Sequence, residues 1–201
     1  MEEQFFDQNE AVLQGVVTGI PARSHESHGE IFYRFPLSVR RLSGAEDVLN
    51  IMVPDRLLEL NPLSLGDWAS LTGEVRTYNN RSGVGSRLVI AVYARTLSMG
   101  CGVPENRLNL RGSLCREPTL RRTPLGREIC DLMLAVNRKY SRADYLPCIA
   151  WGYLAQQCGD KKIGDHLSIT GRLQSRPYTK ETPEGSTQRT AYEVSVMELT
   201  D

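Results

Sequence analysis

The chain has 201 residues, enough for one large domain or two small ones, and hydrophobic residues make up 40% of it. Charged residues make up 24% and the formal net charge is zero, an ordinary composition for a globular protein. No run of eighteen apolar residues is present, so we expect no membrane segment. The acidic start MEEQFFDQNE lacks the order of a signal peptide, so we expect a cytoplasmic protein.

The charge is distributed unevenly along the chain. Residues 1–100 carry 9 arginines, no lysine and 12 acidic residues, whereas residues 101–201 carry 15 basic and 12 acidic residues. Such asymmetry indicates that the second half meets a polyanion, although an excess of three charges is small. The five cysteines include no C-x-x-C pair, and without an export signal we expect reduced, buried thiols.

The sequence repeats itself with an offset of 97 residues. The matches keep their order along the chain, with one residue inserted before the fourth block and a few more before the fifth. The matching pairs are NEAVLQG at 9–15 with NRLNLRG at 106–112, FPLSVRR at 35–41 with LMLAVNR at 132–138, LNIMVPDRLLE at 49–59 with LPCIAWGYLAQ at 146–156, LGDWASLTGEV at 65–75 with IGDHLSITGRL at 163–173, and RLVIAVYARTL at 87–97 with RTAYEVSVMEL at 189–199. We therefore expect a first domain at 1–98, a linker at 99–105 rich in Gly and Pro, and a second domain at 106–201.

Each copy shows short alternating or apolar runs separated by Gly, Pro, Ser and Thr, which predict strands. In the second copy these runs are 108–115, 127–138, 145–151, 166–174 and 189–199. After the third run, PDRLLELNP in the first copy and GYLAQQCGD in the second suit a short helix, and Pro54 fits a first helical turn. This order predicts an all-β protein of two tandem OB-fold barrels, each a five-stranded Greek key with a short helix between strands 3 and 4. Gly112 and Gly171 suit sharp bends that close a small barrel.

The second copy resembles the bacterial single-stranded DNA-binding protein family. The resemblance lies in NRLNLRGSLCREPTLRRTPLGREI, DLMLAVNR, CIAWGYLAQ, KKIGDHLSITGRLQSRPY and YEVSVMEL, whereas the first copy shares only the barrel skeleton. The resemblance implies a tandem two-barrel member that pairs as a homodimer to supply four barrels. The chain stops at ELTD, so the acidic, protein-recruiting tail of typical members is not expected.

Binding single strands without reading sequence needs aromatic platforms for bases and cations along the phosphate path. The resemblance places base-stacking aromatics at Tyr140, Tyr145, Trp151 and Tyr178, the last at the start of a predicted loop, PYTKETPEGSTQ. The candidate phosphate contacts are Arg121, Arg122, Arg138, Lys139, Arg142, Arg176 and Lys180. The expected partner is single-stranded DNA in the nucleoid during replication, recombination or repair. RNA stays open as a ligand, since stacking accepts either sugar.

Strand packing is the alternative reading for two of these aromatics. Tyr145 and Trp151 are six positions apart, so on a regular strand they share a face, and that face could point inward. The polar surroundings of Tyr140 and Tyr178, RKYSRAD and SRPYTKE, argue against a core role for those two.

The first copy lacks most of these platforms, because Ser43, Val48 and Pro54 align with Tyr140, Tyr145 and Trp151. Tyr78 is the counterpart of Tyr178. Phe32, Tyr33 and Tyr93 could offer substitute stacking or could equally pack within the sheet. Our hypothesis is that the second barrel carries most of the DNA affinity and that the first is mainly an assembly element or a weak extension of the binding surface.

The two other classes of function are an enzyme and a protein-binding scaffold. We find no phosphate loop, no G-x-S-x-G and no H-E-x-x-H, and His25-x-x-His28 without a Cys partner is a weak metal pattern, so we expect no enzyme, no metal and no cofactor. The acidic first copy also suits a protein-binding OB scaffold or a primosome-type accessory protein with weak nucleic-acid binding.

Overall fold

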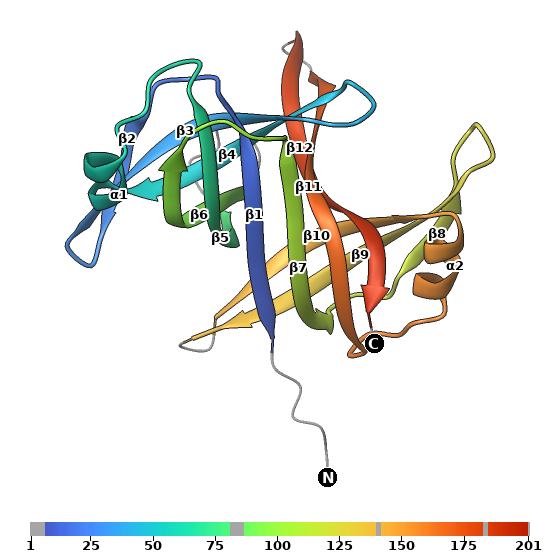
Figure 1. The fold of residues 1–201 in the computed structure, drawn as a ribbon. Helices are drawn as coiled ribbons and strands as arrows, with labels where there is room; N and C mark the ends of the chain where they lie inside the picture. The colour runs from blue at the N-terminus through green and yellow to red at the C-terminus, as the bar shows by residue number, and fades with distance from the viewer. Residues whose placement is uncertain (1–6, 81–86, 140–141, 183–184, 201) are drawn as a thin grey trace. The chain divides into compact units, whose positions relative to one another are not determined.

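The computed structural model describes residues 7–80, 87–139, 142–182 and 185–200 (Figure 1). Strands make up most of this part of the chain, and both helices are short. The elements are β1 (Gln8–Val17), β2 (Ala22–Ser27), β3 (Glu30–Arg40), β4 (Glu46–Pro54), α1 (Asp55–Leu60), β5 (Trp68–Asn79), β6 (Leu88–Met99), β7 (Glu105–Leu114), β8 (Thr119–Arg122), β9 (Glu128–Arg138), β10 (Arg142–Trp151), α2 (Tyr153–Gly159), β11 (His166–Thr182) and β12 (Gly185–Thr200). Among the described residues neither helix has the length and hydropathy needed to cross a bilayer.

The chain forms two compact units, and no single cut in the sequence separates them. The first-copy unit contains residues 11–106 together with the outer part of the β11–β12 hairpin, residues 174–192. The second-copy unit contains residues 107–173 and 193–200, together with residues 7–10 from the start of β1. In the second-copy unit the Asp7 carboxylate accepts a hydrogen bond from the Asn137 backbone N–H at 2.6 Å. Each unit thus includes a short segment from the other repeat.

Each unit is a closed barrel with the same strand order. In the first-copy unit the order is β2-β3-β4-β6-β5-β1, and β1 pairs back onto β3 to close the barrel. In the second-copy unit the order is β8-β9-β10-β12-β11-β7, and β7 pairs back onto β9. The β4–β6 and β10–β12 pairs are parallel, and α1 and α2 follow the third barrel strand of their copies. The predicted Greek-key barrels with a helix between strands 3 and 4 are therefore confirmed.

The barrels close where a glycine allows two strands to approach. A Cβ at Gly112 would lie 2.3 Å from the Ala135 carbonyl oxygen, and one at Gly15 would lie 2.2 Å from that of Ser38. Both glycines sit beside the closing β7–β9 and β1–β3 pairs, where any side chain would separate the strands. Alternate residues fill the interior behind them. The largest fully buried side chains of the second-copy core are Leu108, Leu110, Leu114, Leu134, Leu146, Ile169 and Leu173.

The structure corrects the sequence-based elements in two places. β2 and β8 are additional short strands that pair along the edges of β3 and β9. The loop predicted to begin at Tyr178 is wrong, because β11 continues to Thr182 and β12 begins at Gly185, so the two strands form a long hairpin (Figure 1). Tyr178 and Thr179 favour a strand, and the exposed charged residues Lys180 and Glu181 that follow them suit a two-stranded ribbon that faces solvent.

Candidate nucleic-acid interface

Tyr145 and Trp151 lie on the outer face of β10 in the second-copy unit. Their exposed fractions are 50% and 40%, whereas Asp144, Leu146 and Cys148 beside and between them point into the barrel with at most 3% exposure. The reading of Tyr145 and Trp151 as core residues is therefore wrong, since the strand alternation turns both to solvent. Six residues of strand separate them by about 20 Å.

The neighbouring strands extend the outer face of β10 sideways. Trp151 lies opposite Ile129 of β9, which in turn lies opposite Arg121 of β8, so a row of residues crosses three strands. Tyr145 lies opposite Ala135, a small residue that leaves the phenol ring uncovered. Ile129 is buried at 2% exposure, so the exposed groups of this row are the Trp151 indole, on which a base can stack, and the Arg121 guanidinium.

Tyr178 belongs to the first-copy unit, on the outer part of the hairpin, and is 38% exposed. Arg176 and Lys180 are exposed and stand two positions before and after it on β11. Because side chains alternate along a strand, all three share one face, with a cation on each side of the ring. Tyr140, the fourth predicted platform, lies outside the described residues.

Arg121 and Arg122 of β8 are bound by carboxylates. Arg121 makes two hydrogen bonds to Asp131, at 2.5 and 3.2 Å, and Arg122 bonds to Glu128 at 3.0 Å. The bond to Asp131 raises the pKa of the Arg121 guanidinium, and the bonds from Arg122 and Gln156 lower the pKa of Glu128. Both arginines are thus neutralised locally, which weakens their pull on phosphate.

Arg138 differs from the other predicted cations because its partner is buried. Its Nε lies 3.2 Å from Asp144 Oδ2, and the Asp144 side chain has no exposure. A buried carboxylate is strongly destabilising without its counter-charge. Arg138, at the end of β9, therefore stabilises the fold by neutralising Asp144. Lys139 and Arg142, on either side of the β9–β10 turn, are exposed.

In the first copy, the face equivalent to the Tyr145–Trp151 face is arranged differently. Val48 is 40% exposed at the place of Tyr145, and Pro54 is buried at the place of Trp151. Beside Pro54, Phe32 stacks on His25 with ring centroids 5.1 Å apart and also contacts the Tyr93 ring at 5.8 Å. Phe32, Tyr33 and Tyr93 are all half-buried. The rings of His25, Phe32 and Tyr93 contact one another and form an aromatic cluster.

Tyr78 and two histidines complete the first-copy candidates. Tyr78 is 48% exposed near the end of β5. His25 and His28 bond to the hydroxyls of Ser24 and Ser27, and no group of three metal-binding side chains occurs in the described ranges.

Tyr153 is an exposed aromatic that the sequence-based reasoning missed. It begins α2 two residues after Trp151, and 72% of it is exposed. Ala155 and Cys158 form the buried side of this helix, so Tyr153 and Gln157 point outward and bond to each other at 3.4 Å. The sequence GYLAQQCGD could have predicted this exposure. With a helical period, Tyr153 falls on a different face of the helix from the two small buried residues.

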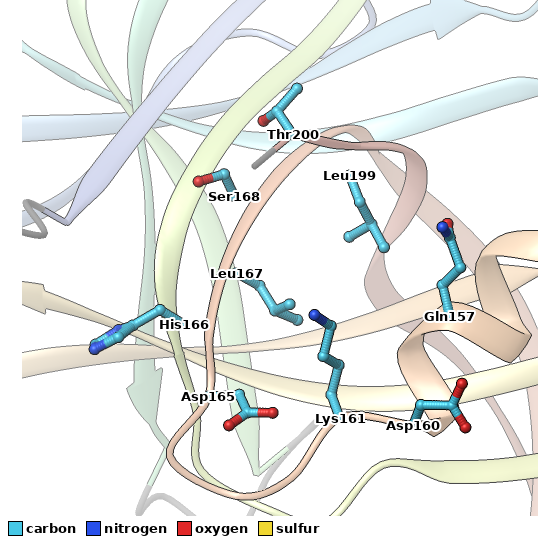
Figure 2. A pocket seen from close by; sticks show the side chains of 9 residues that line it. All are labelled: Gln157, Asp160, Lys161, Asp165, His166, Leu167, Ser168, Leu199 and Thr200. Carbon is cyan, nitrogen blue, oxygen red and sulfur yellow. The ribbon is translucent and has the colours of Figure 1, made fainter.

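A hollow of about 600 Å³ lies in the second-copy unit, bordered by α2 and by parts of β11 and β12. Figure 2 shows Gln157 and Lys161 on one side of it and Leu167 and Ser168 on the other. Its acidic members include Asp165, which accepts a bond from the Lys162 N–H at 2.8 Å. No predicted platform or cation is among its lining residues, so it is separate from the candidate interface.

Two closed five-stranded barrels, each with a helix after its third barrel strand, define a tandem OB-fold protein. A crystal structure of the wild-type single-stranded DNA binding protein from Thermus aquaticus has the same fold, with a TM-score of 0.78 and 24% identity over 97% of this chain and 93% of that one.

The sequence comparisons concern the second copy. The model of the single-strand binding protein family matches residues 105–200. The single-stranded DNA-binding protein of Oceanobacillus iheyensis is 33% identical over 99 residues, which cover 46% of this chain and 58% of that protein. Single-stranded DNA-binding protein A of Bacillus subtilis is 35% identical over 83 residues, or 38% of this chain and 48% of that protein. The second copy is thus similar to the single-strand binding protein family, and the chain spans about half the length of these relatives.

Proposed function

We propose that the protein binds single-stranded DNA with little sequence preference through its second copy. The observation that carries this proposal is the pair Tyr145 and Trp151, two large rings half-exposed on one barrel face that has no need of them for its core. Bases stack on such rings whatever their identity, and each stacked base contributes about 1–3 kcal/mol. The relatives' names and the family match support the same ligand.

The phosphate path follows the exposed cations. Lys139 and Arg142 flank the β9–β10 turn next to Tyr145, and Arg176 and Lys180 flank Tyr178 on the hairpin. Tyr140 belongs to the proposed set through its place in the sequence. Arg121, Arg122 and Arg138 contribute less, because Asp131, Glu128 and Asp144 offset their charge. Binding is passive: the protein coats exposed strands during replication, recombination or repair, without catalysis or a cofactor.

The proposed assembly is a homodimer that supplies four barrels, with boundaries at 1–98, 99–105 and 106–201. The first copy acts mainly in assembly, which its self-stacked cluster of His25, Phe32 and Tyr93 supports. The same features suit a protein-binding scaffold, and that function is the alternative outcome of the test below.

The test is quenching of intrinsic tryptophan fluorescence by oligo-dT at low and moderate salt, comparing the wild type with Trp151→Ala and Tyr145→Ala. The matched control is Trp68→Phe, which removes the other tryptophan, whose indole nitrogen is buried in the first-copy unit. We expect about 5- to 150-fold weaker binding for each platform variant and unchanged affinity for the control. An oligo-dA and an oligo-U arm measure base and sugar preference.

If both platform variants bind as tightly as the wild type and with the same salt dependence, the binding site does not lie on β10. Absence of oligonucleotide binding at low salt would leave the scaffold function, because a strand-coating protein gains affinity as salt falls.

A further inference from the structure

We infer that the first copy positions the hairpin that carries Tyr178, and that Asp47 is the positioning residue. This inference rests on the proposed function and deepens it, because it gives the first copy a part in DNA binding without DNA contacts of its own. All contacts involved lie within the first-copy unit, which contains both β4 and residues 174–192.

The contact is reciprocal. Asp47 Oδ1 accepts a hydrogen bond from the Ser175 backbone N–H at 2.8 Å, and the Val48 backbone N–H donates to Ser175 Oγ at 2.9 Å. Asp47 has no exposure and Ser175 is 9% exposed, so water does not compete for either bond. Residues 128 positions apart in the sequence are thereby fixed to each other by two bonds.

The carboxylate that receives the hairpin is itself held in place. The Arg41 Nε bonds to Asp47 Oδ2 at 2.7 Å, and its second guanidinium nitrogen bonds to Oδ1. Bonds to an ionised acceptor are about twice as strong as neutral ones. The base of the hairpin is therefore bonded to a carboxylate that Arg41 fixes from its other side.

The attachment sets the direction of the DNA-binding side chains. Ser175 faces β4, so by strand alternation Arg176, Tyr178 and Lys180 face the opposite way, and all three are exposed. A two-stranded ribbon alone is marginally stable in water. Holding its base lowers the ordering entropy that a bound strand would otherwise have to offset.

The pair of carboxylate and arginine occurs in both copies. Asp144 is the equivalent carboxylate of the second copy and has the equivalent arginine, Arg138. A second-copy barrel cut at residue 106 would contain the hairpin without Asp47 and Val48. The extra barrel therefore has a use even though most of the platforms are missing from it.

The test uses the full chain with two variants that attack the contact from opposite sides. Ser175→Ala removes the acceptor of the Val48 N–H and leaves the Arg41–Asp47 pair intact, whereas Asp47→Asn removes the charge. The matched control is Ser113→Ala, which removes a strand hydroxyl bonded to His166 in the second-copy unit. Readouts are hydrogen exchange of residues 174–192, oligo-dT affinity and the salt dependence of that affinity.

We expect faster exchange confined to the hairpin, affinity reduced about 3- to 10-fold, and a salt slope shallower by about 0.7 for each phosphate that the hairpin cations no longer neutralise. A smaller fraction of folded protein would not change that slope. The same two variants are also made in a background carrying Arg176→Ala, Tyr178→Ala and Lys180→Ala. There neither variant should weaken binding further, because the side chains that the contact positions are already absent.

Unchanged hairpin exchange in both variants would overturn the attachment. Faster exchange with unchanged affinity and slope would overturn the positioning role. If the triple background itself binds like the wild type, the hairpin does not contact DNA and the inference fails, whereas the platform on β10 is judged separately by Trp151→Ala.

Discussion

Asp47 and Asp144 are fully buried carboxylates at equivalent places in the two barrels, 97 positions apart, and each is bound by the arginine six residues before it. The β3–β4 and β9–β10 strand pairs therefore each have one ion pair between a buried carboxylate and a partly exposed arginine. In the first copy Asp47 also accepts the Ser175 N–H of the hairpin, and in the second copy Arg138 precedes the exposed Lys139.

Arg138→Ala is expected to lower the free energy of unfolding by about 3 kcal/mol, because it leaves the Asp144 charge buried without its partner. Arg142→Ala, on an exposed neighbouring position, should change stability by less than about 0.5 kcal/mol. Urea titration followed by circular dichroism measures both. The fitted slopes should be equal, so that the midpoint alone reports the change.

The two variants should rank in the opposite order when their oligo-dT affinity is measured instead of their stability. We expect Arg142→Ala to weaken binding at constant stability, whereas Arg138→Ala should bind normally once the unfolded fraction is subtracted. Equal stability of the two variants would contradict a structural role for Arg138.

The double variant Arg121→Ala and Arg122→Ala is expected to change oligo-dT affinity less than the double variant Lys139→Ala and Arg142→Ala. Asp131 and Glu128 already offset the first pair, so few counterions are released when DNA arrives there. The salt slope should shrink by about 1.4 for the second variant, which removes two phosphate-binding cations, and by less than about 0.7 for the first. A larger change for the first variant would show that DNA displaces the two carboxylates.

Most of the fold was predictable from the sequence because the repeat supplies two independent copies of each signal. The five predicted strands of the second copy all occur, since alternation at 108–115 and 127–138 and the glycines before each closure favour one topology. The edge strands β2 and β8 were missed. TLRR is fully exposed and ARSHES is exposed or only partly buried, so neither strand has the buried apolar positions that mark a strand in a sequence.

The outward direction of Tyr145 and Trp151 needed the structure. Their spacing shows that they share a face of the strand but does not show whether that face is inside or outside the barrel. A one-residue shift in register would move every side chain of the strand to the other face. The pairing of Arg121 with Asp131 was also hidden, since it depends on the β8–β9 register and on a strand that the sequence did not reveal. The sequence predicts a loop at Tyr178 where the structure has a hairpin, because polar composition marks exposure in strands and loops alike.

Phe32→Ala is expected to destabilise the protein by about 2 kcal/mol while leaving oligo-dT affinity within about twofold of the wild type. Phe32 would no longer stack on His25 or meet the Tyr93 ring, and stacked aromatic pairs contribute about 0.5–1.5 kcal/mol beyond burial. Thermal unfolding and fluorescence titration measure the two effects. Trp151→Ala is the matched comparison and should show the opposite pattern, because its ring is exposed. Strong loss of binding in Phe32→Ala at unchanged stability would place a DNA platform in the first copy.

The thiols should separate into reactive and inert classes at pH 8. Cys101 is exposed, whereas Cys148 and Cys158 are buried among apolar side chains. Burial raises the pKa of Cys158 to about 11 and raises that of Cys148 as well. At pH 8 about one Cys158 in a thousand is ionised, so attack on Ellman's reagent, which needs the thiolate, is slow. We expect rapid labelling of Cys101 and reaction of all five thiols only in urea.

The same shift makes folding stability depend on pH. The unfolded chain releases thiol protons above a pH of about 8.5, whereas the folded protein keeps them until a higher pH. The stability associated with these neutral thiols is therefore complete below that value and is lost as the pH rises toward about 11 for Cys158. Cys158→Ala should flatten the fall in the urea midpoint between pH 8 and 10, and Cys101→Ala should leave it unchanged. Rapid labelling of Cys148 or Cys158 in the folded protein would instead show that the second-copy core opens on the timescale of the reaction, because neither thiolate forms while it stays closed.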